Sequence, residues 1–243
     1  MNLKKIAASG AVAGFLTLSS VFTAMAAPGY SLFDDATLVS PGNASSRAVK
    51  TVSDGTPGWG GVDFVVPAGT TFADLQTLST DYMFEADDSC TGGSPRFSIA
   101  VQDPNSPDTG NIFVYLGPGP NYTGCAANVW LNSGDLLDNA YTVDTGQLDL
   151  GTFYDPYAAA LAKYGDYVVT GVSLVTDGGW AMGDGEQTVF FDNTNVDGDL
   201  YTYEPNVPTS KDQCKNGGYM TLEDANGQPF KNQGQCVSYF NHM

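Results

Sequence analysis

The stretch Arg96-Phe-Ser-Ile-Ala-Val101 carries the clearest indication of fold class in this chain of 243 residues. Its second, fourth and sixth residues are large and apolar and alternate with smaller or polar ones, which is the pattern of a β-strand with one buried face. Two later runs, residues 168–175 and 188–192, are almost continuously apolar, as expected for central strands covered on both faces. Turn residues separate these segments, so the sequence predicts a mainly β chain built from two packed antiparallel sheets.

Weaker strand candidates fill the rest of this region, each bounded by Gly, Asn, Asp or Pro. They are residues 36–40, 47–52, 62–67, 81–85 and 112–116. One helix interrupts the strands at residues 157–164. We expect Asp155 to cap it, Pro156 to occupy its first turn, and Gly165 to end it in the left-handed conformation. Such a helix is expected to cover an open end or edge of the sandwich.

The first 26 residues have the pattern of a bacterial secretory signal peptide. Lys4 and Lys5 precede an apolar stretch, and Ala24-Met25-Ala26 supplies the small residues that a signal peptidase needs. The alternative is a membrane anchor, but glycines and serines make the stretch a marginal span. The sequence therefore predicts a secreted protein, extracellular or at the cell surface, with no membrane insertion in the mature form.

The chain is strongly acidic, with a formal net charge of −18. Removing the predicted signal peptide leaves seven basic and 27 acidic residues, a balance of −20. Such a field repels phosphate backbones and anionic lipid, so nucleic acid and membrane surfaces are not expected partners. With 42% hydrophobic residues, the chain has enough apolar side chains to form a core.

Four cysteines remain after the predicted signal peptide: Cys90, Cys125, Cys214 and Cys236. An even number in an exported chain favours disulfides, and four cysteines allow three pairings. Proximity in the sequence suggests Cys90–Cys125 and Cys214–Cys236. The alternative is a four-cysteine zinc site, which the absence of any Cys-x-x-Cys spacing disfavours.

A change in composition at residues 205–209 divides the chain. Residues 27–204 form the predicted sandwich, residues 205–209 a linker, and residues 210–243 a small C-terminal element that needs its own disulfide to fold. Within this element, Ser210 and Gln213 match a capping box that opens a short helix carrying Cys214. Asn232 is expected to cap a second helix over residues 233–240.

Two stretches resemble known families. The element Ser210-Lys-Asp-Gln-Cys-Lys-Asn-Gly-Gly-Tyr219 with Phe230-Lys-Asn-Gln-Gly-Gln-Cys-Val-Ser-Tyr239 resembles a short C-terminal element of uncharacterised bacterial secreted proteins, which implies that its two cysteines pair. Tyr219 stands where that element carries a Trp. The run Thr188-Val-Phe-Phe-Asp-Asn-Thr-Asn-Val-Asp-Gly198 is similar to the closing strand of jelly-roll domains that bind carbohydrates or are lectin-like, which implies a jelly-roll-like sandwich.

The sequence does not favour an enzyme. After the predicted signal peptide the chain has one histidine, His242, next to the C-terminal residue, whereas a nucleophile needs a rigidly held base. Paired carboxylates are able to hydrolyse glycosides, and Asp63, Glu85 and Glu186 are candidates. No spacing singles out a pair among them, so a glycan-acting hydrolase is the weakest alternative.

Calcium is the metal that the sequence best supports, as a structural ion. Residues 193–204 match the oxygen-ligand loop of helix-flanked calcium sites at several places. The flanking segments are predicted strands, however, and Asp197-Gly198 is a strong signal for a two-residue hairpin turn. The hairpin is therefore the preferred structure, and a calcium ion is compatible with it. The candidate ligands are Asp192, Asn193, Asn195, Asp197, Asp199 and Glu204.

Two tryptophans are candidate ligand-binding residues. Trp59 and Trp180 lie in glycine-rich segments between predicted strands, where a loop is able to present an indole to solvent. Flat aromatic faces of this kind bind sugars, and the alternative is that each indole covers the end of the core. The sequence thus predicts a secreted, non-catalytic β-sandwich that binds an extracellular glycan or cell-surface component. The alternative from another class is a structural or adhesive surface protein without a small ligand.

Overall fold

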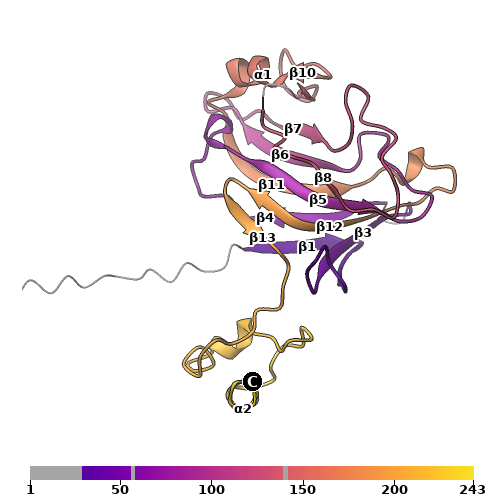
Figure 1. Cartoon of the computed structure of the whole chain (residues 1–243). Coiled ribbons are helices and arrows are strands. Elements are labelled where there is room, and N and C mark those ends of the chain that lie inside the picture. Colours follow the sequence, from indigo (N-terminus) through magenta and orange to yellow (C-terminus); the bar gives the residue numbers. More distant parts are fainter. Residues whose placement is uncertain (1–28, 56–57, 139–141) are drawn as a thin grey trace, which may run out of the picture.

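The computed structural model describes residues 29–55, 58–138 and 142–243. The predicted signal peptide lies outside the described residues. The described chain consists of a two-sheet β-sandwich and a small C-terminal element that stands apart from the sheets (Figure 1). Among the described residues, no helix combines the length and apolar character needed to cross a bilayer.

The first sheet has five strands, and every pairing in it is antiparallel. Its order is β1 (Tyr30–Asp34), β4 (Gly60–Phe64), β11 (Val168–Thr176), β6 (Arg96–Gln102) and β7 (Thr109–Tyr115). The central position of β11 agrees with its almost continuously apolar sequence, because a central strand has neighbours on both sides and a core beneath it.

The second sheet packs on the first and is also antiparallel. Its order is β2 (Ala36–Val39), β3 (Ala48–Ser53), β12 (Gln187–Val196), β5 (Leu78–Phe84) and β8 (Leu131–Asn132), and β13 (Asp199–Tyr201) pairs with β12. The mainly antiparallel β-sandwich predicted from the sequence is therefore confirmed.

Each of the eight predicted strand segments overlaps a strand of the structure, and the largest difference is at residues 62–67, where β4 ends at Phe64. The alternation in β6 has the expected result, because Phe97, Ile99 and Val101 are fully buried between the sheets. Burial of side chains of this size contributes roughly 1.5–3 kcal/mol each. The sequence did not indicate β1, whose residues are only partly buried at the edge of the sheet.

The predicted hairpin after β12 is confirmed. Val196 pairs with Asp199, and the two residues between them have positive φ angles of 54° at Asp197 and 92° at Gly198. These angles define the type of two-residue turn for which Asp-Gly is favoured.

The predicted helix is also present, as α1 (Tyr157–Tyr164), but its ends differ from the prediction. Gly165 has a φ angle of −57°, so it is not left-handed. The Asp155 side chain does not cap the helix; it accepts hydrogen bonds from Thr145 and Lys163. Asp155 belongs instead to a two-stranded sheet of β9 (Thr142–Val143) and β10 (Asp155–Pro156), which lies with α1 at one end of the sandwich (Figure 1).

Both predicted disulfides are present. Cys90 and Cys125 are bonded with their Cα atoms 5.3 Å apart, and Cys214 and Cys236 with theirs 5.7 Å apart. All four sulfurs are therefore used, and the zinc alternative is wrong.

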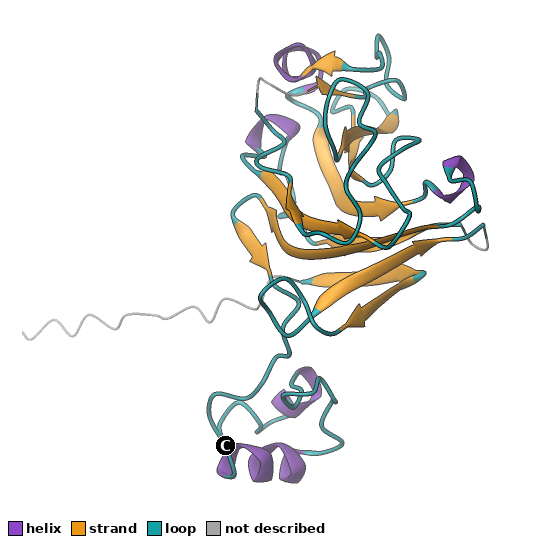
Figure 2. Cartoon of the chain, turned by 45° about the vertical axis from the view of Figure 1, so that its right-hand side comes forward, coloured by secondary structure: helices purple, strands orange, loops and turns teal. Residues whose placement is uncertain are grey.

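The C-terminal element, residues 210–243, contains the short 3₁₀ helix η3 (Gly218–Thr221) and α2 (Gln233–Asn241), as Figure 2 shows. Asn232 caps α2 as predicted, with its side chain accepting from the backbone N–H of Gln235. The predicted helix around Cys214 is absent, because the capping-box hydrogen bonds of Ser210 and Gln213 close a turn that does not continue as a helix.

The element makes an ion pair with the sandwich and hydrogen bonds with the linker, residues 205–209. Glu223 forms an ion pair with Arg47 at 3.0 Å, and its backbone N–H donates to the carbonyl of Asn206 at 2.9 Å. Asn206 also donates from its side chain to the carbonyl of Thr221. These contacts orient the element against the sandwich.

Candidate functional site

Aromatic side chains from three separate loops gather in one open hollow of about 230 Å3 at an end of the sandwich. We refer to it as the aromatic hollow. Its lining residues are Gly92, Gly93, Tyr115, Asn121, Tyr122, Phe153, Tyr154 and Trp180. Loops carried by a rigid sheet scaffold are where binding residues usually collect.

The rings of the aromatic hollow are exposed to an unusual degree. The exposed fractions are 76% for Trp180, 72% for Phe153 and 45% for Tyr154. Tyr154 stacks on Tyr122 with the ring planes 20° apart and the centroids 5.8 Å apart. Large aromatic groups are normally buried, so several exposed together indicate a surface that contacts a ligand.

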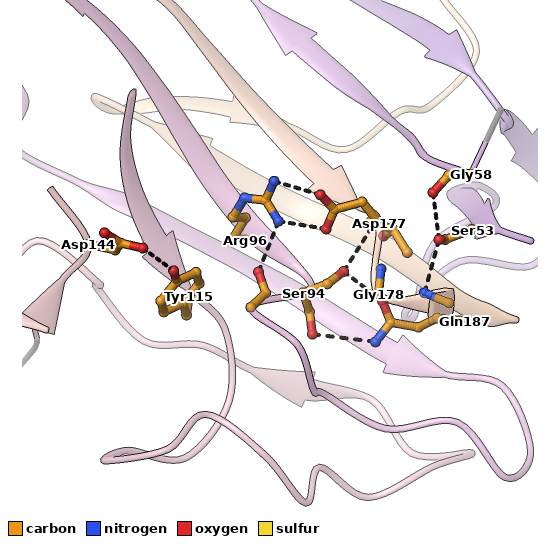
Figure 3. Close-up of polar contacts among 12 residues, drawn as sticks. Ser53, Gly58, Ser94, Arg96, Tyr115, Asp144, Asp177, Gly178 and Gln187 are labelled. Carbon is orange, nitrogen blue, oxygen red and sulfur yellow. Dashed lines mark hydrogen bonds and ion pairs between the residues drawn. The ribbon is translucent and has the colours of Figure 1, made fainter. Parts of the chain in front are cut away.

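The lining residue Tyr115 and its buried partner Asp144 form a polar pair, which we call the floor of the aromatic hollow. The hydroxyl of Tyr115 donates to the carboxylate of Asp144, whose other oxygen accepts from the backbone N–H of Gly146 at 2.8 Å (Figure 3). Burial, together with the adjacent Asp144 carboxylate, raises the pKa of Tyr115 far above its ordinary value. The phenol is therefore a fixed hydrogen-bond donor at neutral pH.

A polar network holds the loop that carries Trp180 (Figure 3). Arg96 donates two hydrogen bonds to the carboxylate of Asp177, at 2.6 and 2.7 Å. The backbone N–H of Asp177 donates to the Ser94 hydroxyl at 2.9 Å, and the backbone N–H of Gly179 donates to the Ser53 hydroxyl at 3.0 Å. Side chains of three strands or loops thus fix the loop from both sides.

Buried Gln187 connects this network to the second sheet. Its side-chain oxygen accepts from the Ser94 hydroxyl at 2.6 Å and from the backbone N–H of Gly178 at 3.2 Å. A Cβ atom at Gly178 would lie 2.5 Å from that oxygen, and one at Gly179 would collide with the carbonyl of Ser53. The two glycines before Trp180 are therefore required by close approach of the backbone.

A disulfide holds the second loop. Cys90–Cys125 links the segment of Gly92 and Gly93 to the segment that carries Asn121 and Tyr122. The Trp180 indole rests against Gly92, where an added Cβ would lie 2.8 Å from the ring. The disulfide thus brings two sides of the aromatic hollow together.

The third loop, residues 146–154, presents Phe153 and Tyr154. Leu150 and Tyr154 have positive φ angles of 58° and 56°, which are strained conformations for residues with a Cβ atom. Hydrogen bonds from α1 hold the segment at Leu150: Lys163 donates to the carbonyl of Leu150 at 3.3 Å, and Tyr164 donates to the carbonyl of Asp149 at 2.8 Å. Strain of this kind is often found where a loop is shaped for a ligand.

The predicted pair of tryptophans is only partly brought together. Trp59 is 47% exposed, and its indole N–H donates to Asp34. The loops of both tryptophans are attached to the same residue, since the Ser53 hydroxyl donates to the carbonyl of Gly58 and accepts from Gly179. Trp59 is nevertheless outside the set of described residues that line the aromatic hollow.

The structure distributes the six predicted calcium ligands over separate places. Asn195 accepts from the N–H of Gly198 within the hairpin, and Asp197 accepts from the N–H of Gln76. Glu204 accepts from the backbone and hydroxyl of Ser46, and Asp199 is exposed. Within the described ranges, no three or more His, Cys, Asp or Glu side chains are grouped as metal ligands.

Asp192, which is buried, and Asn193, which is partly buried, occupy a different position near Asp81. The carboxylate of Asp192 accepts from the N–H of Asn43 at 2.7 Å and from the Ser45 hydroxyl. Asn193 and Asn43 both donate from their side chains to Asp81 at 2.8 Å. Burial raises the pKa of the Asp192 carboxyl, while the hydrogen bonds from Ser45 and Asn43 oppose that shift.

The candidate acid–base residues lie elsewhere. Asp63 accepts from the Ser173 hydroxyl on the first sheet, whereas Glu85 pairs with Lys50 on the second. Glu186 accepts from the hydroxyl of Thr188. His242 lines a separate hollow on the C-terminal element. The structure therefore brings none of these residues into the aromatic hollow.

Sequence reasoning missed the tyrosines and Phe153 of the aromatic hollow. Phe153-Tyr154 follows Gly151-Thr152 and lies outside every predicted strand and helix. Two adjacent aromatic residues in a predicted loop were the available signal, because a loop has no core side in which to bury both of them.

Comparisons with known proteins do not identify a family or a function for this chain. No protein-family model matches the chain, and no curated protein matches it. Among solved structures, the chain is similar to one described as a structural analysis of an exo-beta-agarase, with a TM-score of 0.33 and 13% sequence identity. The match covers 69% of this chain and 23% of that chain, so this chain spans less than a quarter of that protein. A likeness at this level carries no argument about function.

Proposed function

We propose that this protein is a secreted, non-catalytic binding domain for an extracellular glycan or glycan-bearing cell-surface component, with the aromatic hollow as its site. The observation that carries the proposal is the gathering of Trp180, Phe153 and Tyr154, all exposed, in one hollow. Aromatic faces offer a flat, weakly polar surface against which the C–H groups of a sugar ring pack. The Asn121 amide in the lining supplies a donor and an acceptor for sugar hydroxyls.

The preorganisation of the three loops supports binding. The Cys90–Cys125 disulfide, the Asp177–Arg96 ion pair and the hydrogen bonds around Leu150 hold the loops in the form that presents the rings. A site held in its bound conformation loses little conformational entropy when the ligand arrives.

The chemistry of the floor favours binding over catalysis. General acid–base catalysis needs a group whose pKa lies near the working pH. The raised pKa of Tyr115 keeps its proton in place, and both oxygens of Asp144 already accept hydrogen bonds. The hydrogen bonds between these groups fix the shape of the site.

The decisive test compares Trp180→Ala with the unaltered protein in a glycan-binding screen. We expect the affinity for any glycan bound by the unaltered protein to fall by at least about tenfold in the variant, because exposed tryptophans at the centre of a site contribute most of the binding energy. The matched control is Trp59→Ala, which removes the other loop indole and is expected to leave the affinity unchanged.

The screen also separates the alternatives. No binding by the unaltered protein, together with self-association, would favour a structural or adhesive surface protein. Release of reducing sugar from a bound glycan would favour a hydrolase. The assay is run with calcium and with chelator, since a calcium ion at some of the residues 192–204 stays a prediction. A rise in melting temperature with calcium is the expected sign of such an ion.

A further inference from the structure

The charges at the aromatic hollow restrict which glycans it accepts. Its lining residues are glycines, aromatic residues and one asparagine, so it has no charged side chain of its own. The lining residue Tyr115 donates a hydrogen bond to the carboxylate of Asp144, which is 4% exposed.

No basic side chain compensates Asp144 directly. Its hydrogen-bond donors are the Tyr115 hydroxyl and the backbone of Gly146. In the described part of the chain, the five ion pairs involve other carboxylates. A glycan in the aromatic hollow is therefore separated from the buried negative charge of Asp144 by the uncharged phenol of Tyr115.

The cation near Tyr115 is Arg96, and the carboxylate of Asp177 balances its charge. Its guanidinium makes two hydrogen bonds to Asp177 and lies over the ring of Phe113, 4.6 Å from the centroid. The chain as a whole is also strongly acidic, with a formal net charge of −18.

We infer that the aromatic hollow selects neutral glycans and rejects glycans that carry carboxylate or sulfate groups. This inference rests on the proposed function. A carboxylate or sulfate on a sugar in the hollow would be repelled by Asp144, and no free Lys or Arg among the lining residues would offset that repulsion. Long-range repulsion by the acidic surface acts in the same direction.

The test uses pairs of soluble polysaccharides that differ in charge alone: a glucan, a galactan and a mannan, each before and after oxidation of its C6 hydroxyls to carboxylates. Binding is followed through tryptophan fluorescence. We expect any neutral polymer that binds to do so about tenfold more tightly than its oxidised partner in about 0.05 M salt. The ratio should narrow in about 1 M salt, where screening is strong.

The outcomes separate the inference from the proposed function. Equal or tighter binding of the oxidised polymers would overturn the inference and leave glycan binding intact. Failure of every polymer, neutral and oxidised, together with silence in the wider glycan screen, would overturn the proposed function itself.

A matched pair of variants locates the origin of the selectivity. Asp144→Asn removes the charge and keeps an acceptor for Tyr115, so we expect the preference for the neutral polymer to shrink several-fold. Asp63→Asn removes an exposed carboxylate outside the hollow and is the control, for which no change is expected. An unchanged preference in Asp144→Asn would overturn the assignment. Should that variant not fold, the preference of the unaltered protein for neutral over oxidised polymers still decides whether the hollow selects neutral glycans.

Discussion

The sandwich and the C-terminal element are stabilised in different ways. The sandwich buries a continuous cluster of apolar side chains between two sheets, and its disulfide lies at the edge of that cluster. The buried cluster of the element consists of Cys214, Leu222, Phe230 and Cys236, so the disulfide itself is half of its core. A small chain segment cannot bury enough apolar surface to fold without such a crosslink, whereas the sandwich has that surface in excess.

The largest expected effect is in the core of the sandwich. Phe97→Ala should lower the free energy of unfolding by about 3–5 kcal/mol, because it removes a fully buried ring and leaves a cavity. Phe153→Ala is the matched control: the same change at a ring that is 72% exposed should alter stability by less than about 0.5 kcal/mol. Chemical denaturation measures both. Similar losses in the two variants would contradict the division between core and binding surface.

The second-largest expected effect is that removing one disulfide unfolds its region, whereas removing the other only lowers stability. Their loops span 22 and 35 residues, so the chain-entropy model assigns each about 3–4 kcal/mol. Replacing Cys214 and Cys236 with Ser should unfold the element and abolish the hydrogen-exchange protection of α2, while the sandwich stays folded. Replacing Cys90 and Cys125 with Ser should lower the melting temperature of the sandwich but leave it folded. Retained protection of α2 in the first variant would show that the element has a core independent of its crosslink.

The smallest expected effect is on the stability that two ion pairs contribute, one in the sandwich and one in the C-terminal element. Asp155 is buried, and although burial alone would raise its pKa, the hydrogen bonds from Lys163 and Thr145 lower it on balance. A lowered folded-state pKa stabilises the protein above the ordinary pKa of Asp, about 3.9, and that stabilisation is lost as the pH falls through the folded-state value. Lys163→Met should therefore cost roughly 1 kcal/mol at pH 7 and less near pH 3.

The matching pair in the element is Lys215 with Asp212, whose pKa is lowered by the hydrogen bond from Lys215. Both side chains are exposed, so solvent screens their attraction. Lys215→Met should leave hydrogen-exchange protection in the element unchanged at either pH. Thermal melts and exchange at the two pH values test both variants, and equal responses would mean that burial does not determine the strength of these pairs.

The comparison also explains which features the sequence was able to predict. The strand around Phe97 and the Asp197-Gly198 turn depend on residues within a few positions of one another, and both were predicted. The capping box at Ser210 is equally local and its hydrogen bonds form, yet no helix follows it. Cys214 packs there in the small core of the element with its disulfide partner Cys236, and tertiary contacts of this kind act on the chain together with local propensity.

The sequence by itself determined the antiparallel sheets and the hairpin, and it favoured the two disulfide pairs, but it left open whether Trp180 is exposed or covers the end of the core. The sheets, the hairpin and the disulfide pairs follow from periodicity, turn chemistry or short separation along the chain. The tertiary structure alone decided that Tyr122, Tyr154 and Trp180 share one hollow, and that Trp59 does not line it. Those rings are separated by tens of residues and meet because sheet packing and buried polar contacts bring their loops together, and no local pattern records such a meeting.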